Sequence, residues 1–95
     1  MVIRIDALEI DDHILDKIES KHGVDLGEIE EACLSDTVHV RKTKEELYKV
    51  FSKTQAGRYL LIVLVNRGNG IWKVVTARGL NDTERRLYIK ARGGR

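Results

Sequence analysis

The sequence has no proline and only one cysteine, Cys33, among its 95 residues. A single cysteine cannot form an internal disulfide or a multi-cysteine metal site, and we expect it to be a small core residue. The absence of proline argues against a disordered chain. The longest apolar run, Tyr59 to Val65, is far shorter than the roughly 18–20 residues of a membrane span. The acidic N-terminus has no signal-peptide pattern, so we expect a cytosolic protein.

The charged side chains are divided unevenly along the chain. Residues 1–36 hold three basic side chains against eleven acidic ones, a net charge of −8. Residues 37–95 hold fourteen basic against four acidic, a net charge of +10. This division predicts either attraction between two parts of one fold or a basic face kept for an anionic partner, above all nucleic acid. Ordinary solvated acidic helix faces beside a lysine-rich sheet would give the same counts.

The N-terminal third predicts a strand followed by two helices. The strand runs to about Ile10, and the first helix begins after Asp11 or Asp12 as N-cap. A capping box formed by Asp6 and Glu9 is the alternative start of this helix.

Gly23 suits the residue after the first helix, because glycine takes the left-handed conformation without a Cβ clash. The second helix is predicted to follow at once, since Asp25 and Glu28 have the spacing of a capping box. Cys33 lies on its apolar face, which favours packing over reactivity.

The period of the apolar residues changes after Ser35 from helical to alternating, which predicts strands. Glycine-containing turns separate the later ones. The predicted strands cover residues 37–41, 46–53, 59–65 and 71–77.

A last helix is predicted to begin at the N-cap Asn81, with Glu84 at its third position and Leu87 and Ala91 on its packed side. Two helices, a strand meander and a final helix indicate an α+β domain with an antiparallel sheet. We expect one domain over residues 1–92 and a disordered tail at 93–95.

Lys21, His22 and Gly23 have two interpretations. Basic residues in the last turn complement the helix dipole, and the glycine ends the helix, which needs no function. Alternatively, His22 beside Lys21 could act as a general acid or base on a bound phosphate, because the pKa of histidine lies near neutrality.

Arg58 begins the predicted central strand, and Arg78 ends its hairpin partner. Hairpin pairing should bring the two to the same end of the sheet, with Arg85 in the next helix nearby. Two neighbouring guanidinium groups repel each other unless an anion lies between them, so a phosphate site is one hypothesis. A structural carboxylate partner, Glu84 or Asp82, is the other.

The remaining candidate residues give weaker signals. Trp72 is expected in the core rather than as a platform for stacking bases. His13 and His39 are isolated in the sequence. No histidine and carboxylate residues have metal-ligand spacing, so we expect no metal site.

These segments, taken in order over nearly the whole chain, resemble the BrnT-type toxins of bacterial type II toxin–antitoxin pairs, small relatives of the RelE ribonucleases. The resemblance rests on Lys21-His22-Gly23-Val24, Gly57-Arg58, Thr76-Ala77-Arg78, and Glu84-Arg85 with Tyr88.

The resemblance implies a RelE-like two-layer fold and a metal-independent, cofactor-free endoribonuclease. In this reaction a ribose 2′-hydroxyl attacks the adjacent phosphate. It implies that Arg58 and Arg78 hold the scissile phosphate and that Lys21 or His22 acts as base or stabilises charge. The residues expected to contact RNA are Arg85, Tyr88, Arg41 and Lys73.

The resemblance also implies a cognate antitoxin protein that covers the basic face. The chain has Leu47 and Gly79 where these toxins commonly have arginines. A relative with weak or no catalysis, which binds RNA or a partner protein, is therefore the alternative function. A homodimer formed through an exposed edge strand is a third hypothesis.

Overall fold

The computed structural model describes residues 3–35, 38–43 and 46–92, and the predicted tail at 93–95 lies outside them. The elements follow the predicted order of strand, two helices, strands and helix. They are β1 (Ala7–Glu9), α1 (Asp12–His22), α2 (Leu26–Cys33), β2 (His39–Lys42), β3 (Leu47–Lys53), β4 (Tyr59–Gly68), β5 (Ile71–Gly79) and α3 (Asp82–Ala91). None of the helices in this described part is long and apolar enough to cross a membrane.

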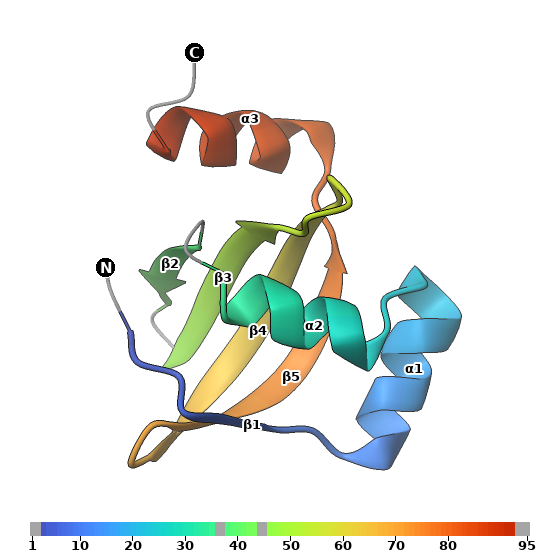
Figure 1. Cartoon of the computed structure of the whole chain (residues 1–95), viewed down its shortest axis with the longest axis vertical. Helices are drawn as coiled ribbons and strands as arrows, with labels where there is room; N and C mark the ends of the chain where they lie inside the picture. Colours follow the sequence, from blue (N-terminus) through green and yellow to red (C-terminus); the bar gives the residue numbers. More distant parts are fainter. Residues whose placement is uncertain (1–2, 36–37, 44–45, 93–95) are drawn as a thin grey trace.

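One five-stranded sheet, in the order β1-β5-β4-β3-β2, forms the centre of the fold. Strands β2 to β5 are an antiparallel meander, as predicted, whereas β1 pairs in parallel with β5. Figure 1 shows α2 in front of one sheet face, α1 at its side next to β5, and α3 across one end of the strands. The prediction of an α+β fold with a mostly antiparallel sheet is confirmed.

The predicted capping residues begin and end the helices. Asp25 and Glu28 form a reciprocal capping box at α2, and Asn81 and Glu84 form another at α3. Gly23 ends α1 with φ +62°, a left-handed conformation that glycine adopts without strain. Local sequence therefore fixes the boundaries where these caps form, because each satisfies backbone groups that the helix itself leaves unpaired. Asp11 begins α1 without a side-chain cap hydrogen bond.

The core lies between the sheet and the pair α1 and α2. Alternate residues of β4 point into it, and Leu60, Ile62 and Leu64 are fully buried there. Trp72 is buried as predicted, and its indole N–H donates to the carbonyl of Arg4 at 2.8 Å. Cys33 is also buried, and burial raises the pKa of its thiol to about 12, so the expected core role is confirmed.

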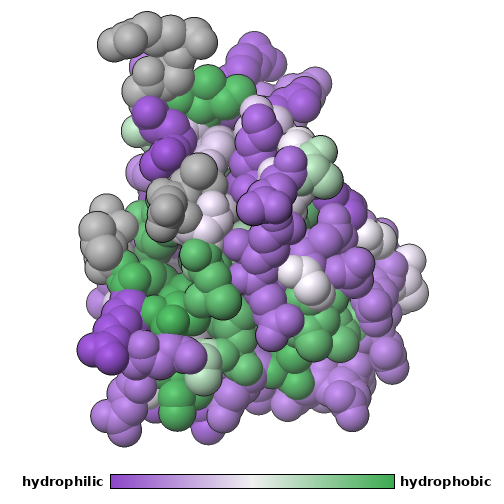
Figure 2. All heavy atoms as spheres, in the orientation of Figure 1, coloured by the Kyte–Doolittle hydropathy of each residue, from purple (hydrophilic) through white to green (hydrophobic). Residues whose placement is uncertain are grey.

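The side of this core that α1 and the N-terminal segment cover is rich in apolar residues. Ile3, Ile5, Ile10 and Ile14 are partly buried and pack against the core. Figure 2 shows hydrophobic residues gathered in the lower half of this face, among hydrophilic ones. Residues 3–10 thus complete the core, while β1 itself extends the sheet by only three residues.

The prediction for the packed side of α3 was wrong. Leu87 is 58% exposed and Ala91 is exposed, whereas Tyr88 is only 5% exposed. Tyr88 packs edge-on against Tyr59, with ring centroids 5.9 Å apart. Helical periodicity predicts that α3 has an apolar side. Which of its side chains are buried depends on how the helix lies across the strand ends.

A tight turn between β4 and β5 fixes the N-terminal segment. The carbonyl of Gly70 accepts hydrogen bonds from the backbone N–H groups of Asp6 and Ala7, at 2.8 and 3.2 Å. Gly70 has φ +78°, and a Cβ atom built on it would overlap the side chain of Asp6. Gly68 in the same turn has φ +91°, but open space surrounds it.

We predict that Gly70→Ala lowers the free energy of unfolding more than Gly68→Ala does. Both substitutions carry the cost of a left-handed non-glycine residue, about 1–3 kcal/mol. Only Gly70→Ala also forces Asp6 and the N-terminal segment to move. Urea unfolding of both variants measures the difference, and equal losses of stability would contradict this account of the turn.

Candidate functional site

The sheet face turned away from α1 and α2, here called the outer face, carries most basic residues of the strands. Consecutive residues of a strand point to opposite faces of the sheet, and Val40, Val50 and Ile62 point into the core. Residues of the other parity therefore lie on the outer face. They include His39, Arg41, Lys49, Phe51, Lys53, Tyr59, Thr76 and Arg78.

A hollow of about 410 Å³ lies between the outer face of β2 and β3 and helix α3. We call it the outer hollow. Three cations, one histidine and one carboxylate are among the residues that line it, and Tyr88 closes one side. The charged and titratable lining residues are His39, Arg41, Lys49, Glu84 and Lys90.

Two cations lie directly opposite each other in this hollow. Arg41 of β2 and Lys49 of β3 are paired in the antiparallel register, and both side chains are exposed. Neither forms an ion pair with any residue that the structure describes. Like charges at directly opposite positions destabilise a sheet. An anion bound between them would remove that cost, so the pair has the character of a phosphate site.

Arg78 flanks this hollow and is held by Glu84. Its two terminal nitrogens donate to the two carboxylate oxygens, each at 2.7 Å. The hydrogen bond from Arg78 lowers the pKa of Glu84, and the charge of Lys49 lowers it further. The same bond raises the pKa of Arg78. Glu84 is therefore a carboxylate near neutral pH, and Arg78 has a fixed orientation.

His39 is the titratable group of the outer hollow whose charge changes nearest to neutral pH. Partial burial lowers its pKa, and the positive charges of Arg41 and Arg92 lower it further. The imidazole lies beside the ring of Phe51, with centroids 6.1 Å apart. A neutral imidazole can accept a proton, which is the chemistry required of a general base. His39, which is isolated in the sequence, therefore has cationic neighbours in the fold.

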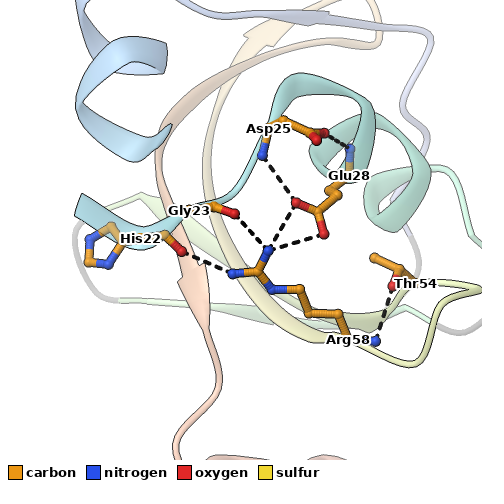
Figure 3. A network of polar contacts seen from close by, with 6 residues as sticks. All are labelled: His22, Gly23, Asp25, Glu28, Thr54 and Arg58. Atoms are coloured by element: carbon orange, nitrogen blue, oxygen red, sulfur yellow. Dashed lines mark hydrogen bonds and ion pairs between the residues drawn. The ribbon is translucent and has the colours of Figure 1, made fainter. Parts of the chain in front are cut away.

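Arg58 points to the opposite side of the sheet (Figure 3), among the ends of the two N-terminal helices. Its guanidinium donates to the carbonyls of His22 and Gly23, at 2.9 and 2.7 Å. It also donates to both carboxylate oxygens of Glu28, at 3.0 and 3.1 Å. Helix C-terminal carbonyls have no partner within their own helix, so the guanidinium satisfies groups that would otherwise depend on water.

The hypothesis that Arg58 and Arg78 share one anion is therefore not supported by the geometry. The register aligns Arg78 with Leu61, three residues beyond Arg58, which places the two side chains on opposite sheet faces. Each guanidinium has its own carboxylate, Glu28 or Glu84. The structural alternative for Arg78, with Glu84 as its partner, is the arrangement observed.

Lys21 and His22 lie away from the outer hollow. They line a separate hollow of about 160 Å³ at the edge of the sheet, beside Val75 and Thr76. The side chain of His22 is exposed, while its backbone carbonyl accepts from Arg58. The two residues can meet solvent, but they do not converge with the cations of the outer face.

The other residues predicted to contact RNA have mixed positions. Arg41 lies in the outer hollow, as described above. Arg85 is exposed, pairs with Asp82 at 3.0 Å, and lies over the ring of Tyr59 at 5.6 Å. Lys73 forms an ion pair with Asp11 at 3.1 Å, which uses its charge within the fold. Tyr88 is buried against Tyr59 and does not offer a ring face to solvent.

Sequence reasoning missed Lys49 as a site residue. The apolar residues of the predicted strand 46–53 lie on both faces, which hides the alternation that places Lys49 outward. Pairing this strand with the one before it, at the register that sets Val40 opposite Val50, would have found Lys49 opposite Arg41. Among the described residues, no group of three metal-ligating side chains comes together.

Comparison with solved structures identifies the fold. The ribonuclease toxin BrnT of Brucella abortus, known from a crystal structure at 1.1 Å resolution, superposes with a TM-score of 0.67. The match covers 80% of this chain and 97% of the toxin, at 15% sequence identity. No family model matches the sequence, and a search of curated proteins finds no match. The chain thus has a BrnT-like fold, as the resemblance of its motifs predicted.

We predict that Arg58→Met lowers the free energy of unfolding by about 1–3 kcal/mol, because Glu28 loses its charged partner and the carbonyls of His22 and Gly23 lose their donor. The range allows for solvent screening of a half-exposed pair. Arg67→Met is the matched control, since Arg67 has only an exposed ion pair with Glu9 at 3.6 Å. Urea unfolding measures both variants. Equal stability of the two would show that the Arg58 network contributes little.

We also predict a pH-dependent contribution from Glu84. Because Arg78 lowers its pKa in the folded state, this contribution is fully present above the ordinary value of 4.5 and is lost as the pH falls through the folded value. The stability difference between the wild type and Glu84→Gln should therefore shrink on acidification. Glu30→Gln, an exposed substitution, controls for the loss of one carboxylate. A difference that stays constant down to acid unfolding would contradict the prediction.

Proposed function

We propose that the chain is the ribonuclease toxin of a type II toxin–antitoxin pair and that it cleaves RNA in the outer hollow. The observation that carries the proposal is the pair of Arg41 and Lys49, which form no ion pair with a described residue and lie opposite each other beside His39. The fold it shares with a ribonuclease toxin supports the same activity. We expect the protein to act in the bacterial cytoplasm, and a cognate antitoxin protein to cover the basic face.

The proposed reaction needs no group beyond the chain and the RNA. The ribose 2′-oxygen forms a bond to the adjacent phosphorus, and the bond from phosphorus to the 5′-oxygen of the next nucleotide breaks. His39, neutral near pH 7, accepts the proton of the 2′-hydroxyl. Arg41 and Lys49 stabilise the negative charge that builds up on the phosphate oxygens. The products are a 2′,3′-cyclic phosphate and a 5′-hydroxyl, whose proton comes from a general acid or water.

Arg78 flanks this phosphate in the orientation that Glu84 gives it. Lys21 and His22 are the second candidates for proton transfer, at the sheet edge. Arg58 keeps a structural role in this proposal, because the observed hydrogen bonds of its guanidinium are directed at the helix ends. The RNA strand would continue past Arg85 along α3.

A second function also has a specific observation in its favour. Glu84 occupies both terminal nitrogens of Arg78, so an incoming phosphate would have to compete with a bidentate carboxylate. Leu47 and Gly79 add no cation nearby. A catalytically weak relative that binds RNA or a partner protein through the outer face would have this arrangement.

Cleavage of single-stranded RNA in the presence of EDTA tests the proposal. We expect products with a 2′,3′-cyclic phosphate, and Lys49→Gln should slow cleavage by about 10²–10³-fold, the cost of removing one contact to a charged transition state. Lys49→Gln should also reduce the salt dependence of RNA binding by about 0.7 in the slope of log K against log salt concentration. Mass spectrometry and filter binding provide the two readouts.

Arg86→Gln is the matched control, because Arg86 is exposed on α3 and does not line the outer hollow. His39→Asn and His22→Asn decide between the two candidate bases, since only the variant of the true base loses cleavage while it still binds RNA. Salt-dependent binding without cleavage by the wild type would favour the second function. No binding at low salt would exclude both.

A further inference from the structure

A second, larger groove lies on the other side of Tyr88. It has a volume of about 750 Å³ and runs between the end of α2, the turn after β3 and helix α3. We call it the α2–α3 groove. Its lining includes Glu31, Leu34, Lys53, Tyr59, Tyr88 and Ile89. Since Tyr88 also lines the outer hollow, the groove and the outer hollow share this residue as a common wall.

The apolar lining of this groove is open to solvent. Leu34 is 62% exposed and Ile89 is 36% exposed, and Tyr59 is half-buried between them and the sheet. Exposed aliphatic and aromatic side chains gathered in a concave surface are typical of a binding site. Of the aromatic residues here, Tyr88 is buried, so Tyr59 is the ring that a ligand can reach.

Two cations lie over the ring of Tyr59. The ammonium of Lys53 is 5.3 Å from the ring centroid, and the guanidinium of Arg85 is 5.6 Å from it. Both side chains are exposed, so either can move aside at little cost. A flat group that stacks on Tyr59 would then lie between a ring and cations, which is the environment that single-stranded nucleic acid finds in its binding proteins.

The charges of the groove favour a negatively charged ligand, and the exposed ring of Tyr59 favours one that also has a flat ring, as a nucleotide has. Lys53 and Arg92 line it, and Arg85 borders it at Tyr59. Glu31 is the one carboxylate among the described lining residues, and it accepts a hydrogen bond from the backbone N–H of Gln55 at 2.8 Å. The remaining field is positive, as a backbone phosphate requires.

We infer that the α2–α3 groove is a nucleobase subsite, in which Tyr59 stacks on a base of the RNA strand that has its scissile phosphate in the outer hollow. Lys53 and Arg85 bind the phosphates next to that base. This inference rests on the proposed function, because the same RNA strand occupies both sites. It adds a binding residue, Tyr59, that contributes ring surface rather than charge.

The test uses short single-stranded 2′-O-methyl RNA, which cannot be cleaved, with an abasic residue at each position in turn. For the wild type, one position should weaken binding by about five- to 150-fold when its base is missing. Tyr59→Leu should weaken binding of the intact strand by a similar factor and lose the effect of the abasic residue. Tyr59→Phe keeps the ring and should bind as the wild type does.

The salt dependence separates this inference from the proposed function. Tyr59→Leu should leave the slope of log K against log salt concentration unchanged, whereas Lys49→Gln lowers it. If the wild type binds RNA and Tyr59→Leu binds equally well, the subsite is overturned while the proposed function stands. If the wild type binds no RNA at low salt, the proposed function is overturned, and the subsite that rests on it is overturned as well.

A second measurement does not depend on the folding of a variant. RNA that carries 5-iodouridine is irradiated on the wild-type protein, and the crosslinked peptide is identified by mass spectrometry. A crosslink to Tyr59 is expected from one uridine position. Crosslinks confined to other residues would overturn the subsite.

Discussion

The guanidinium of Arg58 is the group on which the arrangement of the helix layer depends. It joins the C-terminal carbonyls of α1, the Glu28 carboxylate at the start of α2, and the first residues of β4. Two consecutive helices thereby meet the start of a strand 30 or more residues further along the chain, at one planar group with several donors. Arginine suits this position because its fork of N–H groups can satisfy carbonyls and a carboxylate together, which a lysine ammonium cannot do in the same geometry. Gly23 ends α1 in a left-handed conformation, which glycine adopts without strain, and its carbonyl accepts from Arg58.

The consequence of this contact is a separation of charge between the two sheet faces. The acidic N-terminal helices cover the core face, where Glu28 neutralises Arg58. Among the described residues, no acidic helix layer covers the outer face of β2 and β3, and Arg41 and Lys49 line the hollow beside α3. The opposite net charges of the two parts of the chain therefore agree with both interpretations, attraction within the fold and a basic face for an anionic partner. Part of the charge is compensated within the fold, and part remains on a face where an anion can bind.

Glu84 connects the fold of α3 to the outer hollow. Its carboxylate completes the capping box with Asn81 and also fixes Arg78. A residue that a sequence pattern identifies as a helix cap is therefore also the only carboxylate among the described residues that line this hollow. The two roles are compatible because the cap uses the backbone N–H of Asn81, while Arg78 approaches both oxygens from the strand side. The position of α3, the orientation of Arg78 and the shape of the hollow are consequently coupled.

The sequence by itself determined the helix boundaries, the strand meander and the α+β class, because caps, glycine turns and apolar periodicity act over a few residues. It also determined the identity of buried residues such as Trp72 and Cys33. Only the tertiary structure decided which basic residues lie together. Strand parity and register place Arg58 and Arg78 on opposite faces, and they bring Lys49 opposite Arg41 and near His39. The tertiary structure also decided which side of α3 is buried, because that depends on how the helix lies across the strand ends. These placements depend on how separate segments pair, and a local pattern carries no information about the register that brings such segments together.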